Sequence, residues 1–375
     1  MFNEYNPYDR HRVTFHCLIT LKSPLSHIGK VSGNVSNLKT LTLLDIEGNP
    51  RECLTYSGNA LRNGILRRRG TAAALESLGL SVNPDVHHTL FAGGRIDGST
   101  GNNMELDKQI RQLMPWLSVL GTAKPAGVFG VKDAQMVPGR LAVGSAYLVC
   151  YETAAYLWEQ CPGVLPSEVV APIRDVFEAK AELSTDIFTP PTDEAIEEFR
   201  IAKEFNLPII RKYLRLSTEH ITVDQTTRRD STHDAELTRF LSNQALLKGD
   251  ATSKEKKSDQ MIANDRLIMA GSQLYSRWDF FGTDVEEGFI VDALLKFSES
   301  PYLGGKSNRG NGLVGMQFWF DDHTNRGDYL SVSGTPELSL RASEKHDRWK
   351  EYLSRYQQYL TEAQESTELR GLLGA

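Results

Sequence analysis

The sequence predicts an α+β fold, a β-sheet that is interrupted by helical and polar insertions. Segments with the two-residue alternation of strands and segments with helical periodicity follow one another irregularly, without the βαβα order of a doubly wound protein. Of the 375 residues, 40% are hydrophobic, so the chain can bury a sizeable core. The apolar runs are short and are broken by polar residues, so we expect no membrane span.

The first part of the chain alternates between strands and polar loops before a helix begins. Residues 12–21 (RVTFHCLITL) alternate and are β-branched, and the loop SPLSHIG follows them. Ser57 is a suitable N-cap for the helix that follows. The expected elements are a strand at 12–21, a loop at 31–39, short strands at 40–46 and 52–56 around a turn at Gly48-Asn49-Pro50, and a helix from Ser57.

Later segments mix helices, strands and one long polar stretch. The expected elements are a glycine-rich loop at 93–103, a helix at 105–120 divided at Pro115, a strand at 141–151, acidic helices at 166–206 divided at Pro190-Pro191, an alternating strand at 209–223, a polar segment at 224–259, a strand at 268–281, a helix at 285–299, a strand at 313–320 and a C-terminal helix with Trp349, Leu353, Tyr356 and Leu360 on one stripe.

Charge is unevenly distributed along the chain. The net charge of −6 argues against a protein that coats nucleic acid with its whole surface. Five arginines and the single acid Glu52 lie between Arg51 and Arg69, whereas acids dominate between Glu168 and Glu204. This pattern favours nucleic-acid binding at one place. The four cysteines are far apart and the N-terminus has no apolar core, so we expect a cytoplasmic protein with reduced thiols.

The strongest local motif is the glycine-rich segment 302–315, which also contains Lys306, Asn308 and Arg309. Glycine lets backbone N–H groups approach an anion, and Lys and Arg add charge. A P-loop would need a glycine at the position of Ser300, and a dinucleotide-binding motif would need a helix where a strand is expected. An anion-binding loop and a simple long turn remain as the two interpretations.

Two further motifs lie near the N-terminus. The segment 56–70 (YSGNALRNGILRRRG) places Arg62 and three consecutive arginines on and after a helix start. Three consecutive residues cannot share one helical face, so part of this set is structural or simply solvated. In SPLSHIG, His27 could contact phosphate or act as a general base, although a lone histidine is more often structural.

Metal and nucleophile chemistry is not predicted. His87-His88 lack partners at ligand spacing, and Asp321-Asp322 would point to opposite faces of a strand. The chain has no GxSxG and no Cys/His nucleophile pattern. We therefore expect no catalytic residues, no metal and no cofactor.

The three motifs in this order resemble the RAMP superfamily of CRISPR-associated proteins. The resemblance rests on SPLSHIG after the first strand, TYSGNALRNGILRR at the first helix and YLGGKSNRGNG before a late strand. Residues 125–151 are also similar to the middle strands of that family, and residues 166–206 have no counterpart in it. The chain most resembles backbone subunits of the Cas-seven type, first those of type IV effector complexes and second that of the type I-D complex.

The resemblance implies a ferredoxin-like (RRM-like) palm with insertions. The implied parts are a palm at residues 1–160, 207–223 and 264–340, a helical insertion at 161–206, a thumb-like insertion at 224–263 and a C-terminal helix at 341–375. It also implies a non-catalytic subunit that polymerises head to tail along CRISPR guide RNA (crRNA), with other effector subunits as partners and target nucleic acid bound through the guide. The candidate RNA-binding residues are His27, Lys30, Lys39, Ser57, Asn59, Arg62, Arg67, Arg68, Arg228, Arg229, Gly304, Gly305, Lys306, Ser307, Asn308 and Arg309.

Two departures from the family pattern bear on activity. Tyr56-Ser57-Gly58 stands where the family has Pro before Gly. Type III subunits that cleave target RNA use an aspartate after the first motif; when Asp45 is matched to a downstream family aspartate, the cleaving position falls near Lys39. We therefore expect RNA binding without cleavage. The alternatives are a RAMP-type endoribonuclease that processes guide RNA with His16 or His27 as base, and a structural protein that binds no nucleic acid.

Overall fold

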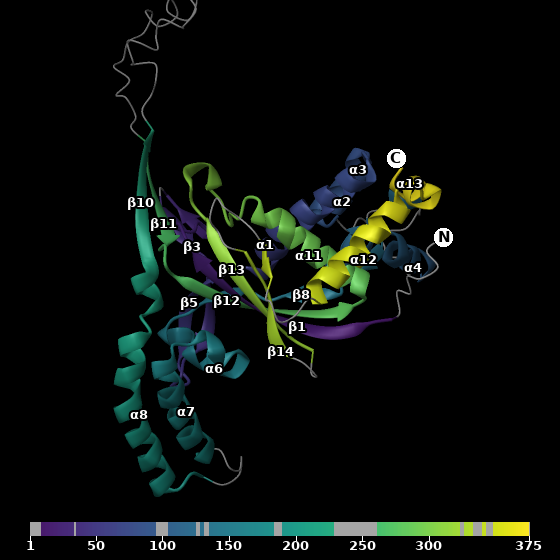
Figure 1. The fold of residues 1–375 in the computed structure, drawn as a ribbon. Helices are drawn as coiled ribbons and strands as arrows, with labels where there is room; N and C mark the ends of the chain where they lie inside the picture. The colour runs from purple at the N-terminus through teal and green to yellow at the C-terminus, as the bar shows by residue number, and fades with distance from the viewer. Residues whose placement is uncertain are drawn as a thin grey trace, which may run out of the picture.

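The computed structural model describes residues 9–33, 35–94, 104–124, 128–130, 135–183, 190–228, 261–322, 326–332, 340–342 and 348–374 (Figure 1). Nine of the described strands form one sheet in the order β15-β14-β13-β1-β12-β9-β5-β4, with β8 beside β12. These strands are β1 (His11–Leu21), β4 (Thr40–Leu44), β5 (Pro50–Tyr56), β8 (Leu141–Val143), β9 (Ala146–Leu148), β12 (Gln273–Gly282), β13 (Val314–Asp321), β14 (Arg326–Val332) and β15 (Leu340–Ala342).

The centre of this sheet has a ferredoxin-like arrangement. In chain order it consists of β1, a helical segment, β9, β12, the helix α11 (Asp284–Ser298) and β13. In space the strand order is β13-β1-β12-β9, and each neighbouring pair is antiparallel. A βαββαβ unit in this order is the ferredoxin-like pattern. The structure thus confirms the predicted α+β fold.

The helical segment after β5 is continuous over three elements. Ser57 caps α1 (Gly58–Leu61) as predicted, because its side-chain oxygen accepts from the backbone N–H of Ala60. A π-helix, η1 (Arg62–Gly70), follows and leads directly into α2 (Thr71–Leu78). A π-helix of this length is rare, and such segments occur frequently at functional sites.

Alternation along β1 divides the molecule into two layers of core. Val13, Phe15 and Cys17 belong to the main core, which also includes side chains of α2, α11 and α12 (Arg348–Ala363). Leu18 points the other way and packs against a second core formed with α6 (Ala154–Gln160), α7 (Ser167–Glu182) and α8 (Asp193–Tyr213). Figure 1 shows α11 and α12 on one side of the sheet and the α6–α8 region on the other. The predicted C-terminal helix is confirmed.

The remaining helical segments differ widely in length. They are α3 (Pro84–Ala92), α4 (Met104–Leu113), α5 (Pro115–Leu120), α6 (Ala154–Gln160), α7 (Ser167–Glu182), α8 (Asp193–Tyr213), α13 (Thr367–Leu373) and the short turns η2 (Val128–Gly130), η3 (Tyr151–Thr153), η4 (Pro162–Val164), η5 (Ser217–His220) and η7 (Ser307–Arg309). In the described part of the chain, no helix combines the length and apolar character that a membrane crossing requires.

Three strand predictions need correction. The expected strand at 209–223 is wrong, because α8 continues to Tyr213 and the next strand begins only at Ile221. Ile210 and Leu214 are four residues apart and both are buried, so the apparent alternation was one helical face. The expected strand at 141–151 is two short strands, β8 and β9. The expected strand at 268–281 contains a turn, since one strand ends at Ile268 and β12 starts at Gln273.

A second sheet with the order β10-β11-β3-β2 stands beside the palm. Its strands are β2 (Ile28–Ser32), β3 (Val35–Leu38), β10 (Ile221–Arg228) and β11 (Met261–Ile268). The loop expected at 31–39 is therefore wrong. β3 pairs in parallel with β11, and this pairing supplies the hydrogen-bond partners of the strand. The Ser/Asn-rich sequence of the segment does not itself favour a strand.

The thumb-like insertion is described only at its base. β10 and β11 are antiparallel and are paired from Ile221–Ile268 to Arg228–Met261 (Figure 1). Most of the predicted thumb, including Arg229, lies outside the described residues, as does most of the glycine-rich loop expected at 93–103. A two-stranded sheet of β6 (Thr122–Lys124) and β7 (Gln135–Val137) lies close to α3.

Candidate nucleic-acid interface

The loop after β1 and the glycine loop before β13 are held together by backbone hydrogen bonds. Gly312 N–H donates to the carbonyl of Pro24 at 2.7 Å, and Gly305 N–H donates to that of Ser26 at 3.3 Å. The hydroxyl of Ser23 accepts from Leu313 N–H at 2.8 Å. Two motifs that are far apart in the sequence thus form one surface.

The helix-start motif joins the same surface through two aromatic rings. Tyr56 accepts from the backbone N–H of Gly304 at 2.9 Å through its hydroxyl oxygen. The ring of His27 lies 4.3 Å from that of Tyr56, and its Nε2 accepts from Ser57 N–H at 3.1 Å. We call the assembly of residues 23–29, 56–58 and 302–313 the motif cluster.

Glycine is required where the loops of the motif cluster cross. Gly304 has φ +74°, and a Cβ atom there would lie 2.2 Å from the carbonyl oxygen of Ser26. Gly312 has φ +87°, and its Cβ would lie 1.9 Å from the carbonyl of Leu303. Lys306 also has a positive φ, 68°, a strained conformation that non-glycine residues adopt mostly at functional sites. Gly305, Ser307 and Asn308 are exposed at the tip of this loop.

The loop cations Lys306 and Arg309 share a buried carboxylate. Both pair with Asp265 of β11, Arg309 at 3.5 Å. Burial raises the pKa of Asp265, but hydrogen bonds from Lys306 and Ser36 and the two positive charges outweigh it and lower the pKa. Sequence analysis missed Asp265, because its partners come from another part of the chain. The two cations are therefore partly neutralised in the free protein.

His27 is neutral in this environment. Burial and then the charge of Lys39 lower its pKa below the ordinary value, so Nε2 can serve as an acceptor for Ser57 N–H at neutral pH. Burial likewise raises the pKa of Tyr56, whose hydroxyl stays protonated. The side chain of His27 thus has a structural role in the motif cluster.

Two candidate lysines and Arg228 lie on or next to the strands of the second sheet. Lys30 is exposed on β2, whereas Lys39 is half-buried, and its N–H donates to the carbonyl of His27 at 2.9 Å. Arg228 ends β10 at the base of the predicted thumb.

Asp45, which we placed in a strand, follows β4 and caps the β4–β5 turn by accepting from the N–H groups of Glu47 and Asn49. That aspartate is structural.

The arginines of the first helix separate into buried and exposed members. Arg67 is 3% exposed and donates to the carbonyls of Leu90, Leu120 and Gly121, the last at 2.7 Å. It therefore stabilises the fold, and its role in RNA binding stays a prediction. Arg68 is exposed on η1. Arg69 donates to carbonyls at the end of α11 and lies over the ring of Phe297.

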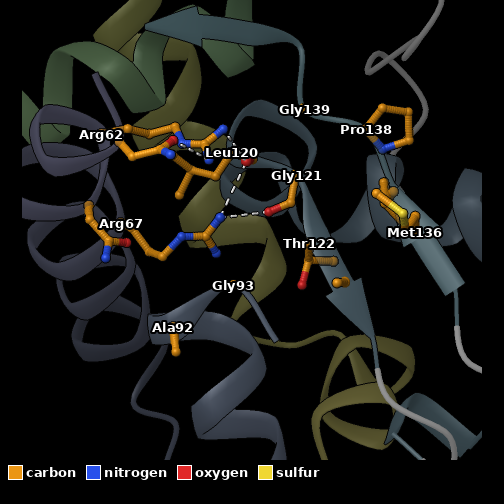
Figure 2. Close-up of a pocket in the computed structure, with 14 residues that line it drawn as sticks. Arg62, Arg67, Ala92, Gly93, Leu120, Gly121, Thr122, Met136, Pro138 and Gly139 are labelled. Atoms are coloured by element: carbon orange, nitrogen blue, oxygen red, sulfur yellow. Dashed lines mark hydrogen bonds between the residues drawn. The ribbon is translucent and has the colours of Figure 1, made fainter. Parts of the chain in front are cut away.

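Asn59 and Arg62 lie together beside the motif cluster. Arg62 donates to the side-chain oxygen of Asn59 at 3.3 Å and to the carbonyl of Leu120 at 3.4 Å. Both residues line a pocket of about 430 Å³ whose other wall is formed by the β6–β7 region (Figure 2). The predicted helix motif therefore has a polar surface that continues away from the cluster.

Asp265→Asn is expected to strengthen RNA binding. Removing the carboxylate frees Lys306 and Arg309 for phosphate, and we expect affinity for single-stranded RNA to rise several-fold, on the order of tenfold at low salt. Filter binding over a salt series would measure this, and the salt dependence should become steeper. Asp107→Asn is the control, because Asp107 pairs with Arg111 on α4, away from the loop. If Asp265→Asn bound RNA no better than Asp107→Asn, the loop cations would not contact RNA.

Solved structures include chains with a fold similar to that of this protein. No protein-family model and no curated protein matches the chain. A chain of a Type IV-B CRISPR complex is 14% identical, with 84% of this chain and 92% of that chain covered at a TM-score of 0.43. The crystal structure of Thermofilum pendens Csc2 is 12% identical, with 98% and 86% covered at a TM-score of 0.35.

Proposed function

We propose that the protein is a guide-RNA-binding backbone subunit of a Class 1, type IV-like CRISPR effector complex. The motif cluster carries this proposal. The three motifs that resemble the RAMP superfamily, separated in the sequence, meet through direct hydrogen bonds between residues 23–29, 56–58 and 302–313. A resemblance without functional meaning would not require these segments to share one surface.

The chemistry of the exposed loop suits a carrier of variable guides. Gly305, Ser307 and Asn308 present backbone and small polar groups, and Lys306 and Arg309 stand beside them. Such groups can bind phosphate and sugar oxygens, and those contacts carry no base preference. A subunit that must accept any spacer sequence needs this lack of base preference.

We infer that the subunit does not cleave RNA. Lys39 stands near the position at which cleaving relatives use an aspartate, and a lysine cannot act there as a carboxylate does. The endoribonuclease alternative has less support. The Nε2 atom of His27 accepts from Ser57 N–H, and Nδ1 of His16 is 2.7 Å from the hydroxyl of Tyr275, on the strand face away from the main core.

The proposed assembly is a head-to-tail filament in the cytoplasm. Copies that repeat along a guide meet through two different faces. A head-to-tail interface of this kind that does not close into a ring gives a helical filament. The acidic α7–α8 insertion would discourage stray RNA on its side of the subunit. Target nucleic acid and the other effector subunits would join through the guide and the filament ends.

Co-expression with a CRISPR array tests the proposal. The protein is purified, treated with nuclease, and the RNA that remains is sequenced. Spacer-derived RNA protected at regular intervals is the expected result. Random cellular RNA after co-expression with the neighbouring genes would contradict it, and regular cuts in a target RNA would contradict the non-catalytic role.

A further inference from the structure

The pocket beside α1 has a cationic wall and an apolar wall. Arg62, Arg67, Asn59 and Asn63 line one side, and Met136, Val137 and Pro138 line the other. Figure 2 shows Arg62 and Arg67 with their guanidinium groups directed toward Leu120 and Gly121, and Met136 and Pro138 across the pocket. Its volume of about 430 Å³ is within the usual range for small-molecule sites. We call it the arginine pocket.

The π-helix brings the two arginines together. In an α-helix, residues five apart lie on different faces, but the wider turn of a π-helix, with its i→i+5 hydrogen bonds, brings them nearer to one face. Arg62 and Arg67 are five apart at the start and within η1, and both donate to the carbonyl oxygen of Leu120. The unusual helix therefore builds one wall of the arginine pocket.

Within the part of the chain that the structure describes, the positive charge in this pocket has no carboxylate partner. Among the described residues, neither Arg62 nor Arg67 forms an ion pair, and their hydrogen bonds go to carbonyls and to Asn59. Burial and then the charge of Arg62 lower the pKa of Arg67 to about 10. Two cations that repel each other in a partly buried site favour an anion between or beside them.

The two arginines would have different roles in binding an anion. Arg67 is fixed by three carbonyls and supplies charge, whereas Arg62 makes bonds of only 3.3 and 3.4 Å and keeps further N–H donors for a ligand. Asn59 is exposed beside it, and Met136, 60% exposed, offers an apolar surface opposite. An anion attached to a flat apolar group matches both walls.

We propose that the arginine pocket binds one nucleotide, with its phosphate on Arg62 and its base against Met136 and Pro138. The nucleotide can belong to a bound RNA strand, in which case the inference rests on the proposed function, or it can be free. The chemistry recognised is the same, a phosphate ester joined to a nucleoside. In both cases this nucleotide contacts the arginine pocket and not the motif cluster.

Binding of small probes tests this pocket. Titration of the full chain with UMP, uridine, inorganic phosphate and an eight-residue oligouridylate is followed by calorimetry. We expect UMP to bind, phosphate to compete with it and uridine to bind poorly. Arg62→Gln should weaken UMP about tenfold or more, because a charged hydrogen bond is lost. Arg174→Gln, the same change at an exposed position of α7, should have no effect.

A second variant separates binding from folding. Met136→Glu places a negative charge on the exposed wall and should weaken UMP comparably, and the exposure of Met136 makes a folding defect unexpected. If the oligonucleotide binds in a way that depends on Arg62 and UMP does not bind, the pocket holds a nucleotide of an RNA strand. If UMP binds in a way that depends on Arg62 and the oligonucleotide does not bind, the pocket proposal holds and the proposed function is overturned. Oligonucleotide binding that neither variant changes, with no UMP binding, would overturn the pocket alone. Equal loss in Arg62→Gln and Arg174→Gln would also overturn it.

Discussion

Arg67→Ala is expected to lower the free energy of unfolding by about 3 kcal/mol or more. The side chain is buried, and its guanidinium donates to three carbonyls that belong to α3, α5 and the residue after α5. Truncation removes these bonds and leaves carbonyls in the interior without a donor. Urea unfolding followed by circular dichroism would measure the loss.

The neighbouring residue provides a matched control for this change. Arg68→Ala removes the same side chain from the same π-helix, but Arg68 is exposed, so we expect a change within about 0.5 kcal/mol. Equal unfolding midpoints for the two variants would contradict the structural role of Arg67. Reversing the charge at Arg67 would therefore test folding.

Gly304→Ala is expected to weaken RNA binding at least about tenfold and to destabilise the loop by roughly 1–3 kcal/mol. A Cβ at this position would lie 2.2 Å from the carbonyl of Ser26, and φ is +74°. The loop must move away, which breaks the bond from Gly304 N–H to Tyr56 and separates the motifs. Electrophoretic mobility shift with single-stranded RNA and thermal unfolding would follow the two effects.

Gly305→Ala is the control for this prediction. Gly305 is the next residue, its φ is not positive, and nothing lies within 4 Å of a Cβ built there. We expect near-wild-type stability and RNA affinity. If Gly304→Ala and Gly305→Ala bound RNA equally well, the crossing of the two loops would not matter for RNA binding, and the motif cluster would be a structural feature only.

Much of the fold could be predicted from local patterns. The alternation of residues 12–21 predicted β1, Ser57 predicted a helix start, and the stripe from Trp349 to Leu360 predicted α12. In each of these elements the buried side chains lie on one face, so the apolar residues recur at the regular spacing of a strand or a helix. The β2–β3 hairpin and the true end of α8 were missed, since a partner strand and the packing against α7 decide them.

The candidate site was predicted as a set of motifs and not as an arrangement. The glycines, Lys306, Arg309 and the arginine-rich helix were found from residue types that suit anion binding. The sequence could not separate Arg67, which is buried, from Arg68, which is exposed, because a π-helix shifts the faces that an α-helical pattern would assign. It also gave no sign that Asp265 neutralises the loop cations.

Local patterns are enough to predict the fold class, the elements with strong periodicity and the residue types available for phosphate. Which of these meet is visible only in the folded chain: the contact of SPLSHIG with the glycine loop, the pairing of Asp265 with Lys306 and Arg309, and the placement of Arg62 and Arg67 on one pocket wall. The physical reason is that periodicity reports the burial of a residue along its own element. Contacts between elements depend on strand order and on backbone hydrogen bonds, which no local pattern encodes.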